Sequence, residues 1–177
     1  MTATVVLCVG NPFRRDDGVA SAVAGLLRSA LPEGVPVVEL DGEPSRIVDA
    51  WAGARLAIVV DAARSGAPPG SVRRVEIAGG DGADRGTAAG PLPATRQASS
   101  HGASLGEAVA LGRALGRLPD RLVLYAVEAG DVGAGPGLSD PVARAVPTVT
   151  AQVRADAAAA APGAAPAVSR TVRPGVA

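Results

Sequence analysis

The sequence has little of several residue types on which common protein classes depend. It contains one cysteine, Cys8, so neither a disulfide within the chain nor a thiolate cage for a metal ion is possible. It contains no lysine, which excludes a phosphate-binding loop of the type G-x-x-x-x-G-K-[ST]. The aromatic residues are Phe13, Trp51 and Tyr125, too few for the stacking platforms of single-stranded nucleic-acid binders.

Charge and hydropathy narrow the class of protein further. The 17 basic residues balance 17 acidic ones, and a chain without net charge does not attract phosphate backbones in bulk, so nucleic-acid binding is disfavoured. No apolar run approaches the roughly 18 residues of a membrane-spanning helix, and no secretory signal precedes the first apolar run. Since 47% of the residues are hydrophobic, the chain has enough apolar residues for a packed core. Because it has a single cysteine and neither a signal nor a spanning segment, we expect a cytoplasmic protein that binds neither nucleic acid nor membrane. We also expect it to be monomeric.

The length of 177 residues suggests one domain. We place this domain at residues 1–155, because residues 156–177 are rich in Ala, Pro and Gly and predict a disordered tail. Residues 79–98 lack any periodicity and predict a long loop. Short apolar runs predict strands at Thr4–Val9, Val35–Leu40, Leu56–Val60, Ser71–Ile77 and Leu122–Val127. The run at Ser71–Ile77 alternates in polarity, which is typical of an exposed or edge strand.

Helical patterns lie between most of these runs. Apolar residues recur at helical spacing over Gly18–Ala30, and Ser45 is placed to cap a short helix. A capping box of the form S-x-x-E opens the predicted helix Ser104–Gly116, and Ser139–Pro141 opens the last helix. Strands that alternate with helices predict an α/β domain, with helices on both faces of a mostly parallel sheet.

In such a sheet ligands bind beyond the carboxyl ends of the strands, so polar residues at those ends are candidate site residues. Asp17 follows the first strand, and Asp61 stands at the end of the third. The only histidine, His101, lies between the long loop and the following helix. First and third strands are usually neighbours in a doubly wound sheet, so the two acids can converge and His101 can reach them. Two carboxylates and an imidazole suit a divalent transition metal such as Zn, Ni, Cu or Fe.

Each of these residues also has a structural interpretation. Asp17 can serve as the N-cap of the helix that follows it, and Asp61 can cap a turn. His101 can be a hydrogen-bonded residue of the surface or core. Asp16 is the better candidate for a purely structural role, paired with one of the two arginines before it.

Four other acids follow strands, and they provide the rim of the same site. Asp41 and Glu43 follow the second strand, although Asp41-Gly42 is equally typical of a turn. Glu128 and Asp131 follow the fifth strand and are placed to line the same site, although we favour the interpretation that both are solvated loop acids. No G-x-G-x-x-G motif and no nucleophile elbow are present, which disfavours a nucleotide binder or a serine hydrolase on a similar sheet.

Several motifs occur in the order found in one known family. They are Val5–Val19 (VVLCVGNPFRRDDGV), Val37–Gly42 (VVELDG), Val59–Gly66 (VVDAARSG), Ser99–His101 (SSH) and Gly135–Leu138 (GPGL). In this combination the sequence resembles the nickel–iron hydrogenase maturation endopeptidases, over residues 4–153. The resemblance implies an α/β three-layer sandwich around a five-stranded sheet, of the phosphorylase/hydrolase-like kind.

The resemblance also implies an activity and a site. Members of the family remove a C-terminal extension from the hydrogenase large-subunit precursor after nickel insertion, so the nickel is supplied by the substrate. The family's metal-contacting residues correspond to Asp17, Asp61 and His101, and a further acid that matters for activity corresponds to Asp41. We expect either the metal or a carboxylate, Asp17 or Asp61, to activate the attacking water. The alternative from another class is a non-catalytic, metal-sensing chaperone of the large subunit.

Overall fold

The structure, a computed structural model, describes residues 4–78 and 102–160. The predicted long loop at 79–98, the candidate ligand His101 and residues 161–177 of the predicted tail lie outside the described residues. Within the described ranges, no helix is both long and apolar enough to cross a membrane.

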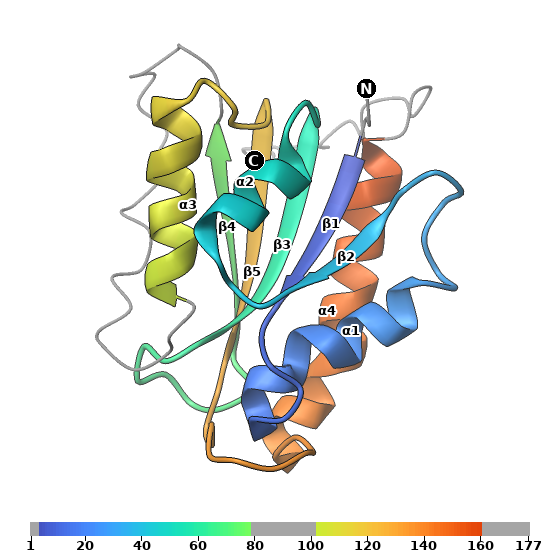
Figure 1. The fold of residues 1–177 in the computed structure, drawn as a ribbon. Helices are drawn as coiled ribbons and strands as arrows, with labels where there is room; N and C mark the ends of the chain where they lie inside the picture. Colours follow the sequence, from blue (N-terminus) through green and yellow to red (C-terminus); the bar gives the residue numbers. More distant parts are fainter. Residues whose placement is uncertain (1–3, 79–101, 161–177) are drawn as a thin grey trace, which may run out of the picture.

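The centre of the molecule is a five-stranded sheet in the order β2-β1-β3-β5-β4 (Figure 1). Its strands are β1 (Thr4–Val9), β2 (Val37–Leu40), β3 (Leu56–Ala63), β4 (Val72–Ala78) and β5 (Arg121–Glu128). Strands β1, β2, β3 and β5 are parallel, and β4 pairs antiparallel with β5 at one edge. Both the mostly parallel sheet and the edge position of the fourth strand are therefore confirmed. Apolar runs in the central strands are continuous because helices cover both faces.

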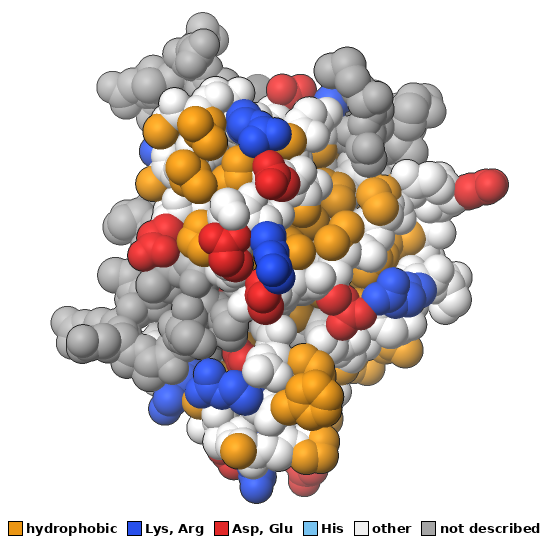
Figure 2. Space-filling view, viewed as in Figure 1, with side chains coloured by type: hydrophobic (Ala, Val, Ile, Leu, Met, Phe, Trp, Pro, Cys, Tyr) orange, Lys and Arg blue, Asp and Glu red, His pale blue; other side chains and the backbone are white. Residues whose placement is uncertain are grey.

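In the described ranges, four α-helices form the two outer layers. They are α1 (Val19–Leu27), α2 (Pro44–Trp51), α3 (Gly102–Ala114) and α4 (Asp140–Ala159), and a short 3-10 helix, η1 (Arg15–Gly18), precedes α1. Helices α1 and α4 enclose one apolar core with the sheet, and α2 and α3 enclose the other. The three-layer α/β fold is confirmed. Charges of both signs are interspersed on the face of the molecule seen in Figure 2.

The predicted caps of α2 and α3 are wrong. The N-cap of α2 is Glu43, whose carboxylate accepts the N–H of Arg46 at 2.9 Å, because Pro44 already occupies the first helical position. Helix α3 begins at Gly102, so Ser104 lies inside the helix. An S-x-x-E sequence is compatible with the interior of a first turn as well as with a cap.

The last helix continues past the predicted end of the domain at residue 155. Asp156 accepts hydrogen bonds from the Tyr125 hydroxyl at 2.6 Å and from Nε of Arg74 at 2.9 Å, and Ala157 is 1% exposed. Residues 156–159 are therefore helical and not part of a disordered tail, since α4 extends to Ala159. An alanine-rich stretch has a low-complexity composition but also the highest helix propensity.

Candidate active site

Asp61 lies inside a central strand rather than after it. Strand β3 continues to Ala63, and Asp61 pairs in register with Val9 of β1 and Ala126 of β5. The residue is 4% exposed. A turn-capping role is wrong for a residue in this position. A carboxylate contributes nothing to the ladder and is costly to bury, so its place in the core of the sheet indicates a chemical role.

Asp17 lies in the short helix η1 and is 2% exposed. Its Oδ2 accepts the N–H of Asn11 at 3.1 Å, which closes the loop after β1. Gly10 begins this loop with a φ of +154°, and a Cβ at that position would lie 2.2 Å from the backbone oxygen of Asp17. The N-cap of α1 is Gly18, so the prediction that Asp17 caps this helix is wrong. The loop is thus folded back tightly, and only glycine fits at its start.

The segments that carry the two acids meet at one end of the sheet. Helix η1 packs against β3, and β1 ends at Val9, beside Asp61. The prediction that the first and third strands are adjacent in the sheet is therefore confirmed. Among the residues in the described ranges, no three His, Cys, Asp or Glu side chains are grouped as metal ligands. Because His101 lies outside those ranges, the set Asp17, Asp61 and His101 stays a prediction.

Asp16 is fully buried and binds the loop between β5 and α4. The N–H groups of Gly130 and Asp131 donate to its Oδ2 at 2.9 and 2.8 Å. Ser139 donates twice, from its hydroxyl to Oδ2 at 2.9 Å and from its N–H to Oδ1 at 2.7 Å. Asp16 therefore has the structural role that the sequence predicts. Its predicted pairing with an adjacent arginine is wrong, because the loop after β5 supplies four donors to the carboxylate.

The pKa of Asp16 lies below its ordinary value. Burial alone raises the pKa of a carboxyl, but the N–H groups of Asp131 and Ser139, with the other donors, stabilise the charged form and outweigh burial. Arg15, directly before it, has a φ of 46°, which residues other than glycine rarely adopt. The Arg15 N–H donates to the Gly135 oxygen at 2.8 Å, and the Arg15 guanidinium pairs with Asp131 at 3.2 Å. These contacts hold the turn in an unfavourable backbone conformation.

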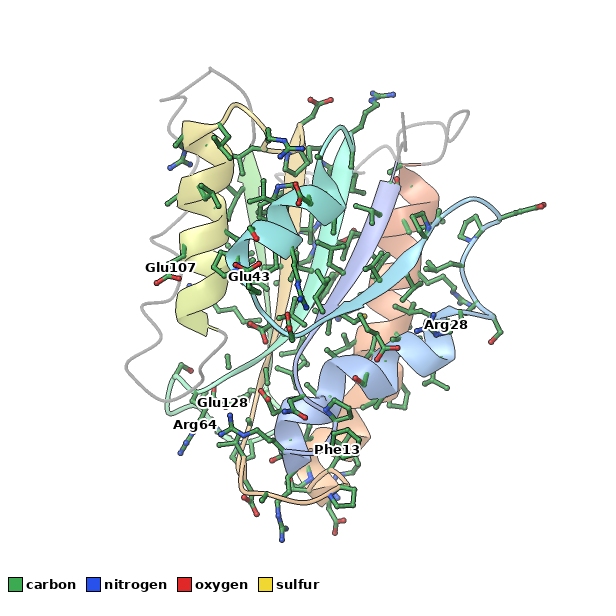
Figure 3. All side chains as sticks on the ribbon, viewed as in Figure 1. Phe13, Arg28, Glu43, Arg64, Glu107 and Glu128 are labelled. Carbon is green, nitrogen blue, oxygen red and sulfur yellow. The ribbon has the colours of Figure 1, made fainter. Side chains whose placement is uncertain are left out.

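Glu128 anchors a second loop at this end of the molecule (Figure 3). It is 5% exposed, and its carboxylate accepts the Ser65 N–H at 2.8 and 3.1 Å, the Ser65 hydroxyl at 2.8 Å and the Gly66 N–H at 2.9 Å. The interpretation of Glu128 as a solvated loop acid is wrong. Because β5 continues through Glu128, its side chain is held among the donors of the loop after β3.

We call residues 10–14, 64–71 and 129–139 the mouth loops. Two of their glycines have no room for a side chain: a Cβ on Gly130 would lie 3.0 Å from Cγ of Pro69, and a Cβ on Gly70 would lie 2.4 Å from the oxygen of Pro141. Asp16 and Glu128 bind the backbone of two of these loops. The surroundings of Asp17 and Asp61 are thus a rigid, hydrogen-bonded collar.

Asp41 and Asp131 are more exposed than Asp17 and Asp61, and Cys8 is buried and unreactive. Asp41 has a side chain 62% exposed, pairs with Arg46 at 2.9 Å and accepts the N–H of Glu43 at 3.3 Å in the turn after β2. Asp131 is 52% exposed and belongs to the collar through Arg15. Burial raises the pKa of the Cys8 thiol to about 12, so this side chain is not a nucleophile at neutral pH.

The sequence matches the HycI family, described as hydrogenase maturation protease, over residues 22–155. The chain belongs to the hydrogenase maturation protease family. The match includes Asp41, Asp61 and His101 and begins after Asp17. No curated protein matches the sequence significantly.

Solved structures of similar fold agree with the fold of this protease. The hydrogenase maturating endopeptidase HybD from Escherichia coli superposes with a TM-score of 0.71 at 24% identity, covering 89% of this chain and 93% of that chain. The NiFe hydrogenase maturation protease HybD from Thermococcus kodakarensis gives 0.66 at 21% identity, covering 87% and 98%. HycI from Thermococcus kodakarensis KOD1 gives 0.62 at 20% identity, covering 89% and 93%.

The protease uses two acids whose contacts sequence reasoning did not identify, Asp16 and Glu128. Asp16 stands next to Asp17 in an acidic doublet after a buried strand. Such a doublet allows one carboxylate to serve the structure while its neighbour serves the chemistry. Glu128 is the first charged residue after the apolar run of β5, as Asp61 is after that of β3. In both strands the acid is part of the strand and its carboxylate is buried.

Proposed function

We propose that this protease removes the C-terminal extension of a nickel–iron hydrogenase large-subunit precursor after nickel insertion, and that it recognises the bound nickel through Asp17, Asp61 and His101. The observation that carries the proposal is the pair of acids, 2% and 4% exposed, on segments that meet at one end of the sheet in a hydrogenase maturation protease. Carboxylate and imidazole side chains are suitable ligands for a divalent transition metal.

The nickel is part of the substrate in this proposal. A metal ion next to the scissile bond polarises the carbonyl, or lowers the pKa of water from 15.7 towards about 7. A carboxylate general base, Asp17 or Asp61, would contribute roughly 10²–10⁴-fold. In either case the water adds OH to the carbonyl carbon, the C–N bond breaks, and the leaving nitrogen takes a proton.

The geometry of the acids supports a site that needs a metal from outside. Asp17 is oriented by the Asn11 N–H at 3.1 Å, and the collar around it is fixed by Asp16 and Glu128. Three protein ligands leave coordination positions for the substrate's own ligands. Cleavage then depends on nickel loading, which makes the reaction a checkpoint on maturation. Asp41, exposed on the rim, contributes to activity by contacting the substrate beside this site.

Processing assays with nickel-loaded and metal-free precursor test the checkpoint. We expect cleavage of the loaded precursor alone, and equal cleavage of both forms would refute metal recognition. Asp17→Asn, Asp61→Asn and His101→Ala should each abolish processing without lowering the melting temperature appreciably. Asp120→Asn is the matched control, because Asp120 is an exposed acid that precedes β5 at the opposite end of the sheet.

Family membership favours an enzyme over the metal-sensing chaperone that the sequence left as an alternative. The same variants separate the two functions. In a chaperone, Asp17→Asn would weaken nickel-dependent binding of the precursor, and the wild-type protein would bind the precursor without ever cleaving it.

A further inference from the structure

Phe13 is the exposed aromatic side chain of the described part of the protein. Its exposure is 74%, whereas Trp51 and Tyr125 are 0% and 1% exposed. It lies in the mouth loop between β1 and η1, at the end of the molecule where β1 finishes (Figure 3). A large apolar side chain in water is a favourable contact surface for a partner when its position is fixed in advance.

The backbone around Phe13 is fixed in this way. The Phe13 N–H donates to Oδ1 of Asn11 at 2.9 Å, and the Phe13 oxygen accepts the N–H of Gly135 at 2.9 Å. Arg14 forms an isolated β-bridge with Gly135 of the mouth loop at residues 129–139. Binding through Phe13 therefore needs little ordering of the chain, which lowers the entropic cost of association.

Arg64 provides a cation at the same end of the molecule. It directly follows β3, three residues after Asp61, and Figure 3 places it beside Glu128 at the end that carries Phe13. The next two residues of its loop are bound by the Glu128 carboxylate, so the loop that presents Arg64 is fixed. Arg64 is half-buried and has no ion pair or hydrogen bond with another described residue. A partly desolvated guanidinium in this state is suited to an oxygen acceptor from a ligand.

In the lower part of the surface seen in Figure 2, apolar side chains lie among basic and acidic ones. A protease that cleaves a polypeptide at Asp17 and Asp61 must bind the chain on either side of the scissile bond. Phe13 precedes Asp17 by four positions and Arg64 follows Asp61 by three, so both residues lie on the segments that carry the two acids.

We propose that Phe13 and Arg64 form a docking rim for the polypeptide of the precursor: Phe13 packs against an apolar side chain, and Arg64 binds a carbonyl or carboxylate oxygen of the segment that crosses the site. This inference rests on the proposed function, since it assigns the substrate contacts of the same site. The rim binds protein and not metal, so it acts on the precursor whether or not nickel is loaded.

Steady-state processing of nickel-loaded precursor tests the rim. Phe13→Ala and Arg64→Ala should each raise KM about tenfold and leave kcat within about twofold, because they remove binding that is equal in ground and transition states. Phe13→Leu should retain most of the binding, since an apolar side chain remains. The matched controls are Leu115→Ala, an exposed apolar residue just after α3, and Arg55→Ala, an exposed arginine before β3 at the opposite end of the sheet. Both controls should keep the wild-type KM.

A direct binding measurement tests the docking rim independently of nickel-dependent cleavage. Immobilised metal-free precursor should bind the wild-type protease and the two control variants equally, and should bind Phe13→Ala and Arg64→Ala about tenfold more weakly. Wild-type KM values and wild-type affinities for both rim variants would overturn the docking rim while leaving metal-dependent cleavage intact. Cleavage independent of nickel, together with weakened binding of the rim variants, would refute the checkpoint and support the rim.

Discussion

Replacement of Asp16 tests whether one buried carboxylate holds the candidate site together. In Asp16→Ala, the N–H groups of Gly130, Asp131 and Ser139 and the Ser139 hydroxyl lose their acceptor. A hydrogen bond to a charged group contributes roughly 1.5–3 kcal/mol, and a donor left unsatisfied costs about 1–3 kcal/mol. Water that enters the space left by the carboxylate accepts some of these hydrogen bonds and so reduces the loss. We therefore expect the free energy of unfolding to fall by about 4 kcal/mol, which is about 1 kcal/mol for each of the four donors that lose their acceptor.

Thermal denaturation followed by circular dichroism measures this loss. For a chain of this length, about 4 kcal/mol corresponds to a decrease in Tm of roughly 8–16 °C. Asp16→Asn should fall between the wild-type protein and Asp16→Ala, because its amide oxygen still accepts hydrogen bonds on one side while its NH₂ group faces a donor on the other. Asp131→Ala is the control: its exposed side chain forms a surface ion pair with Arg15 and accepts the N–H of Gly133 at 2.9 Å, so its loss should cost only about 1 kcal/mol.

The reasoning is refuted if Asp16→Ala and Asp131→Ala have the same Tm. That result would mean that the backbone contacts between η1 and the loop after β5 suffice without the carboxylate. A large loss in both variants would place the stabilisation in the Arg15–Asp131 pair instead.

Three further predictions concern other parts of the fold. Tyr125 is the only tyrosine, and burial, followed by its hydrogen bond to Asp156, raises its pKa to about 12. Because the folded-state pKa lies above the ordinary value of 10.0, its contribution to stability is complete below pH 10 and is lost as the pH rises through 12. Ultraviolet titration of tyrosinate should show ionisation near pH 12 or coincident with unfolding; a midpoint at pH 10 in folded protein would contradict the prediction. Gly70→Ala should cost more than about 2 kcal/mol by denaturant unfolding, because its Cβ meets backbone 2.4 Å away, and Gly66→Ala, with a similar φ in open space, should cost clearly less. Glu128→Gln should lower the unfolding free energy by about 2 kcal/mol, since one of its acceptor oxygens becomes a donor facing N–H groups; an unchanged denaturation midpoint would show that the loop does not need the charge.

The sequence predicts the strands where burial alone determines them. The first strand is confirmed residue for residue at Thr4–Val9, because a strand covered on both faces is a continuous apolar run. Strands β3 and β5 are longer than predicted at their carboxyl ends, and in both the prediction stopped before an acid, Asp61 or Glu128. An apolar run in the sequence ends at the first charged residue. The backbone hydrogen bonds of a strand continue through that residue wherever the fold can hold its charged side chain.

Helix boundaries and loop contacts are predicted less well for a different reason. The cap at Glu43 depends on a proline that fixes the first turn, and the extension of α4 depends on Asp156 meeting Tyr125 from another element. The partners of Asp16 are mostly backbone N–H groups more than a hundred residues away along the chain. Backbone donors are present at almost every residue, so no pattern of side chains in the sequence marks which of them a carboxylate will bind.

The acidic doublet after the first strand shows how one short segment serves structure and chemistry together. Successive residues of a 3-10 helix point about 120° apart, since this helix has three residues per turn. In η1, Asp16 is therefore directed to the donors of the loop after β5, while the next carboxylate, on Asp17, is directed elsewhere and meets the Asn11 N–H. The four donors on Asp16 fix η1, and a fixed η1 fixes the direction of Asp17. A substitution of Asp16 should thus impair processing even in a protein that remains folded, and a substitution of Asp17 should impair processing without loosening the loop.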